Sequence, residues 1–132
     1  HRNTYINAPQ CLHQTGQSRQ RVDLFFAGQI MGSEGYAGNI ASGLVAGINM
    51  SRYLKQQDFL IFPHETMVGA LMHYLVYADP QNFQPMKANF GLLPVLDNPV
   101  RSKRERGFAF SRRAVRTLTD FISETGILQN VQ

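Results

Sequence analysis

Residues 22–38, with the sequence VDLFFAGQIMGSEGYAG, decide the expected fold. The first six residues are mostly apolar and aromatic, which predicts a short strand covered on both faces. Gly28, Gly32, Gly35 and Gly38 follow, and a helical pattern then extends from about residue 39 to residue 55. A strand, a glycine turn and a helix in this order predict an α/β fold.

Outside this stretch, the sequence predicts two more helices and few strands. A short strand is possible at residues 4–7, within a loop-like segment that ends near residue 21. Apolar stripes predict helices over residues 64–77, opened by Pro63, and over residues 111–124, capped by Ser111. The proline-rich residues 79–100 predict an extended connection. Because a doubly wound sheet needs at least four or five strands, we expect the missing strands upstream and the domain to be incomplete.

Composition and length restrict the class of protein. A chain of 132 residues with 43% hydrophobic and 17% charged residues is typical of one globular domain. Its apolar runs are far shorter than the roughly 20 residues of a membrane span, and its start does not resemble a signal peptide. The lone Cys11 allows no disulfide within the chain and no cysteine-rich zinc site. We therefore expect no membrane association and a reducing cytoplasm.

Two local patterns suggest binding sites. The turn at residues 28–38 precedes a helix, and unpaired N–H groups at such a helix start bind anionic or electron-rich ligands such as a nucleotide cofactor. Its glycine spacing matches neither GxGxxG nor a phosphate loop, so a packing turn stays an alternative. Gly43 and Gly47 share one face of the following helix, which predicts close approach to a sheet or ligand.

The second pattern is a basic segment. Residues 101–116 hold seven of the 13 Lys and Arg residues and only one acid, Glu105. These cations could contact RNA phosphates while Phe108 and Phe110 stack on bases, or they could form a solvated helix face. The candidate RNA contacts are Arg101, Lys103, Arg104, Arg106, Arg112 and Arg113.

Other polar residues give weaker signals. His64 and His73 are nine residues apart, which places them on opposite sides of the predicted helix and argues against a metal site. We expect His73 to be half-buried beside Tyr74 and Tyr77. A cysteine such as Cys11 could act as a nucleophile, but an ordinary loop cysteine is the favoured interpretation.

Several motifs resemble one known family. They are NTYIN (residues 3–7), LFFAGQI (24–30), EGY (34–36), HYLVYADPQNFQPM (73–86) and NFGLLP (89–94). Over residues 1–117 the chain resembles the C-terminal part of the bacterial folate- and FAD-dependent tRNA (uracil-5-)-methyltransferases, the TrmFO family. A related flavoprotein that modifies wobble uridines shares the AGQI-like turn and the AGIN-like helix at residues 46–49. It lacks the two later motifs.

This resemblance implies a fold and an enzymatic activity. The fold would be the C-terminal part of a Rossmann-like FAD-binding domain: its last sheet strand and packing helices, with residues 1–58 contacting the flavin and residues 59–132 as a helical extension. In the parent enzyme NAD(P)H reduces FAD, methylenetetrahydrofolate supplies the carbon, and a cysteine upstream of this chain activates a T-loop uridine of tRNA. The fragment alone is expected to be inactive.

The resemblance also assigns residues. Those expected at the flavin are Gly28, Gln29, Glu34, Gly35, Tyr36, Gly38, Asn39 and Ile40, and those on the folate side are Asn3 and Tyr5. Gly38-Asn39 and His64 depart from the family, where a polar pair such as Glu-Ser and an arginine are expected. Expected partners are tRNA and the upstream remainder of the polypeptide, and an exposed cofactor-side face could cause self-association. The alternatives are the wobble-uridine flavoprotein and a non-catalytic RNA-binding or assembly module.

Overall fold

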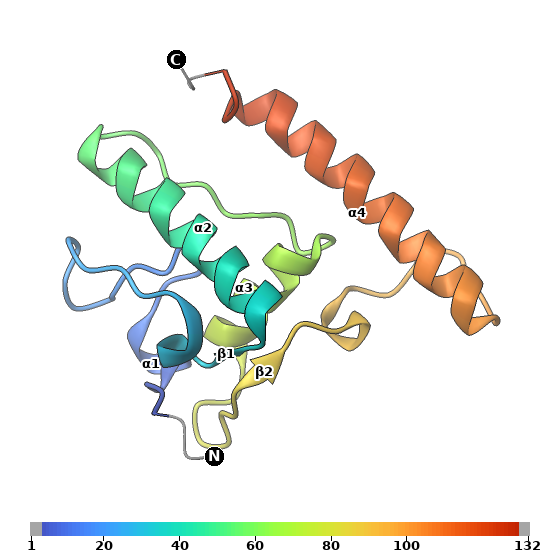
Figure 1. The fold of residues 1–132 in the computed structure, drawn as a ribbon, viewed down its shortest axis with the longest axis horizontal. Coiled ribbons are helices and arrows are strands. Elements are labelled where there is room, and N and C mark those ends of the chain that lie inside the picture. The colour runs from blue at the N-terminus through green and yellow to red at the C-terminus, as the bar shows by residue number, and fades with distance from the viewer. Residues whose placement is uncertain (1–3, 130–132) are drawn as a thin grey trace.

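The computed structural model describes residues 4–129. Its helices and strands, in chain order, are α1 (Ala8–Cys11), the 3-10 helix η1 (Gly28–Met31), β1 (Ser33–Glu34), α2 (Tyr36–Leu54), α3 (Met67–Tyr77), β2 (Met86–Lys87), the 3-10 helix η2 (Phe90–Leu92) and α4 (Lys103–Thr125) (Figure 1). The two strands pair in parallel, with Ser33 opposite Met86 and Glu34 opposite Lys87. The class is therefore α/β, with a very small sheet.

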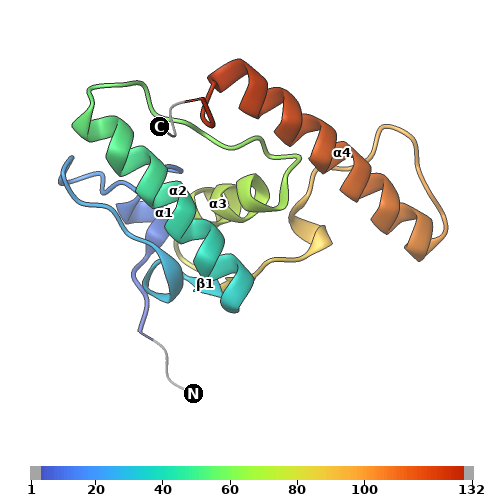
Figure 2. The same ribbon diagram turned by 45° about the horizontal axis from the view of Figure 1, so that its top comes forward.

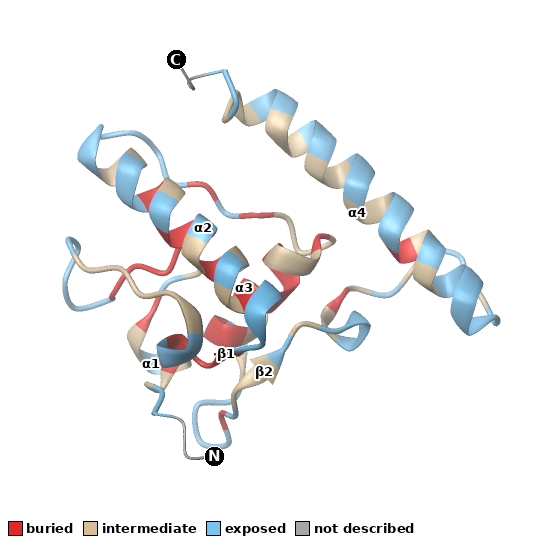
Figure 3. Ribbon diagram, in the orientation of Figure 1, coloured by how far each residue is buried: buried red, intermediate tan, exposed pale blue. Residues whose placement is uncertain are grey.

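The helices form a packed group and one outlying member. α2 and α3 contact each other, and α1, η1 and the sheet lie beneath them. α4 lies to one side of this group in both ribbon views (Figures 1 and 2) and is mostly exposed (Figure 3). α2 and α4 run in the same direction, so their N-terminal ends point to the same side of the molecule. No helix among residues 4–129 is long and apolar enough to cross a membrane.

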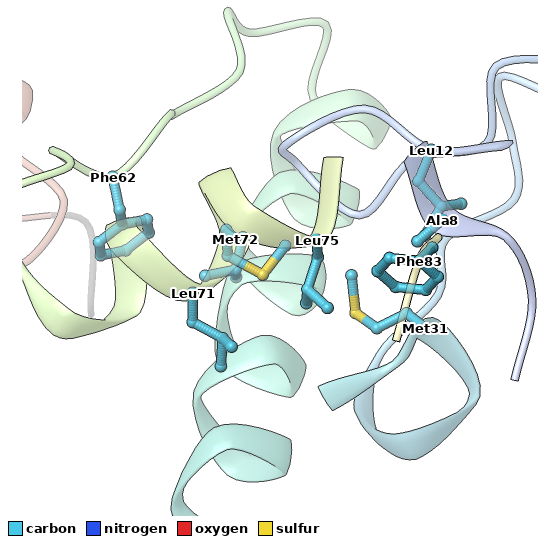
Figure 4. Packing of buried hydrophobic residues seen from close by; sticks show 9 residues of the cluster. Ala8, Leu12, Met31, Phe62, Leu71, Met72, Leu75 and Phe83 are labelled. Atoms are coloured by element: carbon cyan, nitrogen blue, oxygen red, sulfur yellow. The ribbon is translucent and has the colours of Figure 1, made fainter. Parts of the chain in front are cut away.

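The core forms around α3. Leu71, Met72 and Leu75 are buried there with Met31 and Phe83, and Figure 4 shows Leu75 directed toward these last two residues. The other buried members of this cluster are Ala8, Leu12, Val45 and Phe62. The apolar stripe predicted for residues 64–77 is thus the centre of the fold, because its side chains remove the most apolar area from water.

The prediction of strands was wrong at residues 22–27 and 4–7. Residues 24–26 pair only with a short segment: the Ser18 N–H donates to the Leu24 carbonyl and the Phe26 N–H to the Gly16 carbonyl, each at 2.8 Å. Val22 is 62% exposed. An apolar run becomes a sheet strand when a neighbouring strand pairs with it along its length. Among the described residues this run has only an isolated bridge, between Gln17 and Phe25.

Helix starts also differ from those predicted, because local caps set them. α3 begins at Met67 rather than residue 64, since the Thr66 hydroxyl accepts from the Gly69 N–H at 3.0 Å. α4 begins at Lys103 rather than residue 111, because Ser102 caps it by accepting from the Glu105 N–H at 3.4 Å. The first turns of α4 are polar and exposed, so no apolar stripe marked them as helical.

A buried amide takes the place of a strand partner for the loop between α2 and α3. Asn49 of α2 is fully buried. Its Nδ2 donates to the Leu60 carbonyl at 2.9 Å, and its Oδ1 accepts from the Leu60 N–H at 2.7 Å. One side chain therefore satisfies both backbone polar groups of Leu60, which allows this irregular segment to be buried.

Close packing makes Gly69 a sensitive position. A Cβ at residue 69 would lie 1.9 Å from the Pro63 carbonyl oxygen. We expect Gly69→Ala to lower the free energy of unfolding by at least about 2 kcal/mol, measured by urea denaturation. Gly107→Ala is the matched control: its Cβ would lie 3.8 Å from Phe90, and better helix propensity should leave stability equal or raise it by up to about 1 kcal/mol. Equal stabilities for the two variants would contradict this packing.

Candidate functional site

The glycine turn is fixed to α2 by one buried hydroxyl. Ser42 is fully buried, and its Oγ accepts from the Gly28 N–H at 2.8 Å and donates to the Asn39 carbonyl at 3.0 Å. These two bonds hold the start of η1 against the first turns of α2. Ser42 was not a predicted site residue, although it and Asn49 are polar residues on the buried face of an otherwise apolar helix. Polar residues on the apolar face of a predicted helix were the sequence signal that could have identified Ser42.

The N-terminus of α2 is open to a ligand. Gly35 precedes it with φ 77° and ψ 157°, no side chain caps it, and no acidic residue lies in its first turn. A positive φ of this kind combined with extended ψ is nearly restricted to glycine. The first N–H groups of a helix have no partner within the helix, and they lie at the positive end of its dipole. The neighbouring Glu34, Gly35 and Tyr36 are all exposed.

An unpaired acceptor lies beside this helix end. The Oδ1 atom of Asn39 is buried and has no hydrogen-bond partner, and a Cβ at Gly28 would lie 4.0 Å from it. A buried acceptor without a partner costs free energy that a ligand hydroxyl or N–H could recover. The arrangement therefore suits a ligand that carries both an electron-rich or anionic group and hydrogen-bond donors.

The structure brings most of the predicted flavin residues to this end of α2. Gln29, Glu34, Gly35, Tyr36 and Ile40 are exposed there, whereas Gly28 and Asn39 are half-buried. Gly38 instead faces inward, since a Cβ there would lie 2.8 Å from the Ser33 Oγ. Its contribution within the described structure is close packing against β1.

Of the two predicted folate-side residues, Tyr5 lies within the described structure, beside η1. The Ile6 N–H donates to the Ile30 carbonyl at 2.8 Å, which places Tyr5 beside η1. The Tyr5 ring is 36% exposed and meets Phe83 edge-on at 5.9 Å. Asn3 lies outside the described residues.

One face of α2 has no partner within residues 4–129. Tyr36, Ile40 and Leu44 are 91%, 74% and 58% exposed, and they recur every four residues along the helix. A Cβ added at Gly43 or Gly47 would have nothing within 4 Å. The close sheet or ligand predicted for these glycines is therefore not among the described residues.

The basic segment divides into free and engaged cations. Arg101, Lys103, Arg104 and Arg106 are exposed at the start of α4, and Arg112 is exposed further along it. Arg113 differs, because its guanidinium donates to the Val95 and Pro94 carbonyls at 2.8 and 2.5 Å. This corrects its prediction as a free phosphate contact: Arg113 holds the segment before α4 in place.

The predicted base stacking by the aromatic residues of this segment also needs correction. Phe110 is 9% exposed and stacks on Phe90, with ring centroids 5.6 Å apart, so it is not free to stack on a base. Phe108 is 53% exposed and lies under the Arg104 guanidinium at 5.7 Å. Phe90, which is 52% exposed, is the aromatic residue that sequence reasoning missed. It lies in the NFGLLP motif, but its pairing with Phe110 depends on tertiary structure.

His64, His73 and Cys11 lie in packed surroundings in the described structure. His64 and His73 are not on opposite sides of a helix, because His64 precedes α3 and its ring stacks on that of His73 at 4.0 Å. His73 is half-buried, and its ring lies 4.6 Å from that of Tyr77. No group of three or more metal-binding side chains occurs within residues 4–129. Cys11 is half-buried against the core.

Comparisons with known proteins give relatives over nearly the whole chain. Residues 1–58 match the family described as glucose inhibited division protein A. Proteins named methylenetetrahydrofolate–tRNA-(uracil-5-)-methyltransferase TrmFO are similar: 46% identical over 124 residues in Anoxybacillus flavithermus (94% of this chain, 29% of that protein), 48% over 130 residues in Lactiplantibacillus plantarum (98% and 30%), and 51% over 119 residues in Symbiobacterium thermophilum (89% and 27%). The chain thus spans less than a third of the length of these relatives.

The hydroxyl of Ser42 should be important for stability near the turn. Ser42→Ala leaves the partly buried Gly28 N–H without a partner, so we expect the free energy of unfolding to fall by about 1–3 kcal/mol in urea titrations. Ser51→Ala, an exposed change on the same helix, should stay within about 0.5 kcal/mol of the wild type. Similar losses for both variants would show that the Ser42 bond has no special role.

The stacked histidines predict a pH dependence of stability. Burial, and then the nearby His64, lower the pKa of His73 below its ordinary 6.5. The unfolded chain therefore binds this proton more readily, so the free energy of unfolding should fall as the pH drops below about 6.5 and should level off beneath the folded pKa. His73→Gln should flatten this part of a stability–pH curve. An unchanged slope in the variant would exclude His73 as its source.

Proposed function

Since this chain belongs to the TrmFO family and spans less than a third of its relatives, we propose that it is part of a flavin- and folate-dependent tRNA (uracil-5-)-methyltransferase. The family resemblance expected from the motifs is confirmed by relatives at 46–51% identity. The proposed substrate is a T-loop uridine of tRNA, and methylenetetrahydrofolate is the proposed carbon donor. The proposed location is the cytoplasm, where tRNA is modified.

The open end of α2 is the proposed flavin site. Gly28 and Gln29 would approach the ribityl chain, and Glu34, Gly35 and Tyr36 would lie along the flavin ring, with Asn39 and Ile40 beside it. Bound FAD, reduced by NAD(P)H, would supply the electrons that convert the folate-borne carbon into a methyl group. The positive end of α2 favours a negatively charged ring. The buried Asn39 Oδ1 lacks a partner and can accept a hydrogen bond from a flavin hydroxyl or N–H.

The remainder of the polypeptide is proposed to complete the FAD-binding domain. We propose that the glycine turn and α2 are the C-terminal part of a Rossmann-like FAD-binding domain. The other part would supply its sheet and cover the exposed face of α2 beyond the flavin, at Leu44. Without that cover, this apolar face favours self-association. The catalytic cysteines are proposed to lie in that other part, because Cys11 packs against the core.

The folate and tRNA would approach from neighbouring surfaces. Tyr5 lies beside η1 and is a proposed folate-side residue, together with Asn3. The N-terminal ends of α2 and α4 point to the same side, so tRNA could reach the flavin side from α4. Arg113, engaged with the preceding segment, would support this surface indirectly. The cations proposed to hold the tRNA are Arg101, Lys103, Arg104, Arg106 and Arg112.

A second candidate function is a non-catalytic RNA-binding or assembly module. The observation that favours it is the exposed, cation-rich start of α4, which lies apart from the packed helices. The wobble-uridine flavoprotein is less favoured, because the relatives described above carry the TrmFO name. A measurement of flavin binding distinguishes the proposed enzyme from the non-catalytic module.

Gly35 carries the test of the flavin site. In the full-length protein, Gly35→Val should abolish flavin retention, measured by absorbance near the flavin maxima after gel filtration, because a branched side chain cannot adopt the backbone of residue 35. Gly126→Val is the matched control, since Gly126 also has a positive φ, 61°, at the far end of α4. It should be destabilised but keep its flavin. A folded Gly35→Val protein with full flavin content would refute this site.

A further inference from the structure

A recess lies between η2 and the first turns of α4, apart from the proposed flavin site. It has a volume of about 570 Å³, which is within the range of small-ligand sites. Its lining consists of two aromatic rings, three cations and a glycine: Phe90, Phe110, Lys103, Arg104, Arg106 and Gly107. The lining contains no acidic residue, so its chemistry favours a ligand that is both aromatic and anionic.

The aromatic part of the recess is supported from below and accessible from outside. Phe90 and Phe110 stack at 5.6 Å with an angle of 16° between their planes. Phe110 is buried in a cluster with Ala70 and Leu93, so it supports Phe90, which remains half-exposed. Gly107 has no side chain to cover the Phe90 edge, from which a Cβ would be 3.8 Å away. The result is a supported aromatic platform that is open to solvent.

The charged part of the recess has no counter-ion within the described chain. Lys103, Arg104 and Arg106 are exposed, and the ion pair found among residues 4–129 is the distant Arg21–Asp23. Glu105 shares this turn of α4 but does not line the recess. The N-terminal end of α4 adds positive potential at the same place. Such a cluster attracts phosphate groups.

We propose that this recess binds one unstacked nucleotide of RNA, with its base on Phe90 and its phosphate among Lys103, Arg104 and Arg106. This proposal rests on the proposed tRNA function and specifies how the tRNA is held. A base in a duplex is hidden by its neighbours, whereas a loop nucleotide offers a free ring face and a phosphate together. The recess therefore selects looped or single-stranded RNA over duplex RNA.

The test compares RNA with and without bases. The probes are a fluorescent uridine hexanucleotide and an abasic ribose-phosphate strand of equal length, titrated against the full-length protein by anisotropy. Phe90→Leu keeps an apolar contact with Phe110 but removes the ring. It should weaken binding of the uridine strand by about fivefold or more and leave the abasic strand unchanged. Val115→Ala, an exposed apolar change elsewhere on α4, should change neither affinity.

The cations are tested through salt dependence. The double variant Lys103→Gln, Arg106→Gln should weaken both strands and make log affinity fall less steeply with log salt, by roughly 0.7 for each phosphate that is no longer neutralised. Lys55→Gln, an exposed change at the end of α2, should keep the wild-type slope. Equal binding of the two strands by the wild type, or an unchanged uridine affinity in Phe90→Leu, would overturn the base platform. An unchanged salt slope in the double variant would overturn the phosphate contacts.

Flavin measurements separate this proposal from the proposed enzyme. Gly35→Val should lose flavin and keep the base-dependent binding of the uridine strand. A wild-type protein that binds the strand through Phe90, yet has neither flavin nor methyltransferase activity, would refute the enzyme and support the recess. Active, flavin-containing Phe90→Leu protein with wild-type affinity for both strands would refute the recess and leave the enzyme intact.

Discussion

The hydrogen bonds that α2 provides to irregular backbone are the constraint on which the rest of the structure depends. The described strands contain two residues each, so long loops cannot pair their polar groups with a sheet. The Ser42 hydroxyl accepts from the Gly28 N–H in the glycine turn, and the Asn49 amide pairs with the N–H and the carbonyl of Leu60. Since a buried N–H or carbonyl without a partner costs about 1–3 kcal/mol, these side chains decide where the loops can be buried.

The same constraint prepares the proposed flavin site. The Ser42 hydroxyl holds Gly28 and Asn39 together, so the turn and the helix end meet at fixed geometry before any ligand arrives. The N-terminus of α2 is left uncapped and the Asn39 Oδ1 is left without a partner. An uncapped helix end that is already held in place needs little reorganisation on binding, which favours affinity.

The basic start of α4 is held by apolar packing rather than by hydrogen bonds from α2. It is attached through Phe110, which is buried in a separate cluster with Ala70 of α3 and Leu93, while Arg113 fastens the preceding segment. The helix can therefore extend its cations into solvent while its attachment stays apolar. Because α2 and α4 point the same way, a polyanion on α4 would lie on the side to which the α2 dipole is directed.

The sequence by itself determined the α/β class, the glycine turn, the family and the existence of the three long helices found among residues 4–129. These depend on local periodicity, on glycine and on motif identity, which the chain order records directly. Tertiary structure alone decided that residues 22–27 are not a strand, that His64 stacks on His73, that Arg113 is engaged and that Phe90 pairs with Phe110. Each of these depends on a partner distant in sequence or absent from the described residues, and local pattern contains no information about such partners.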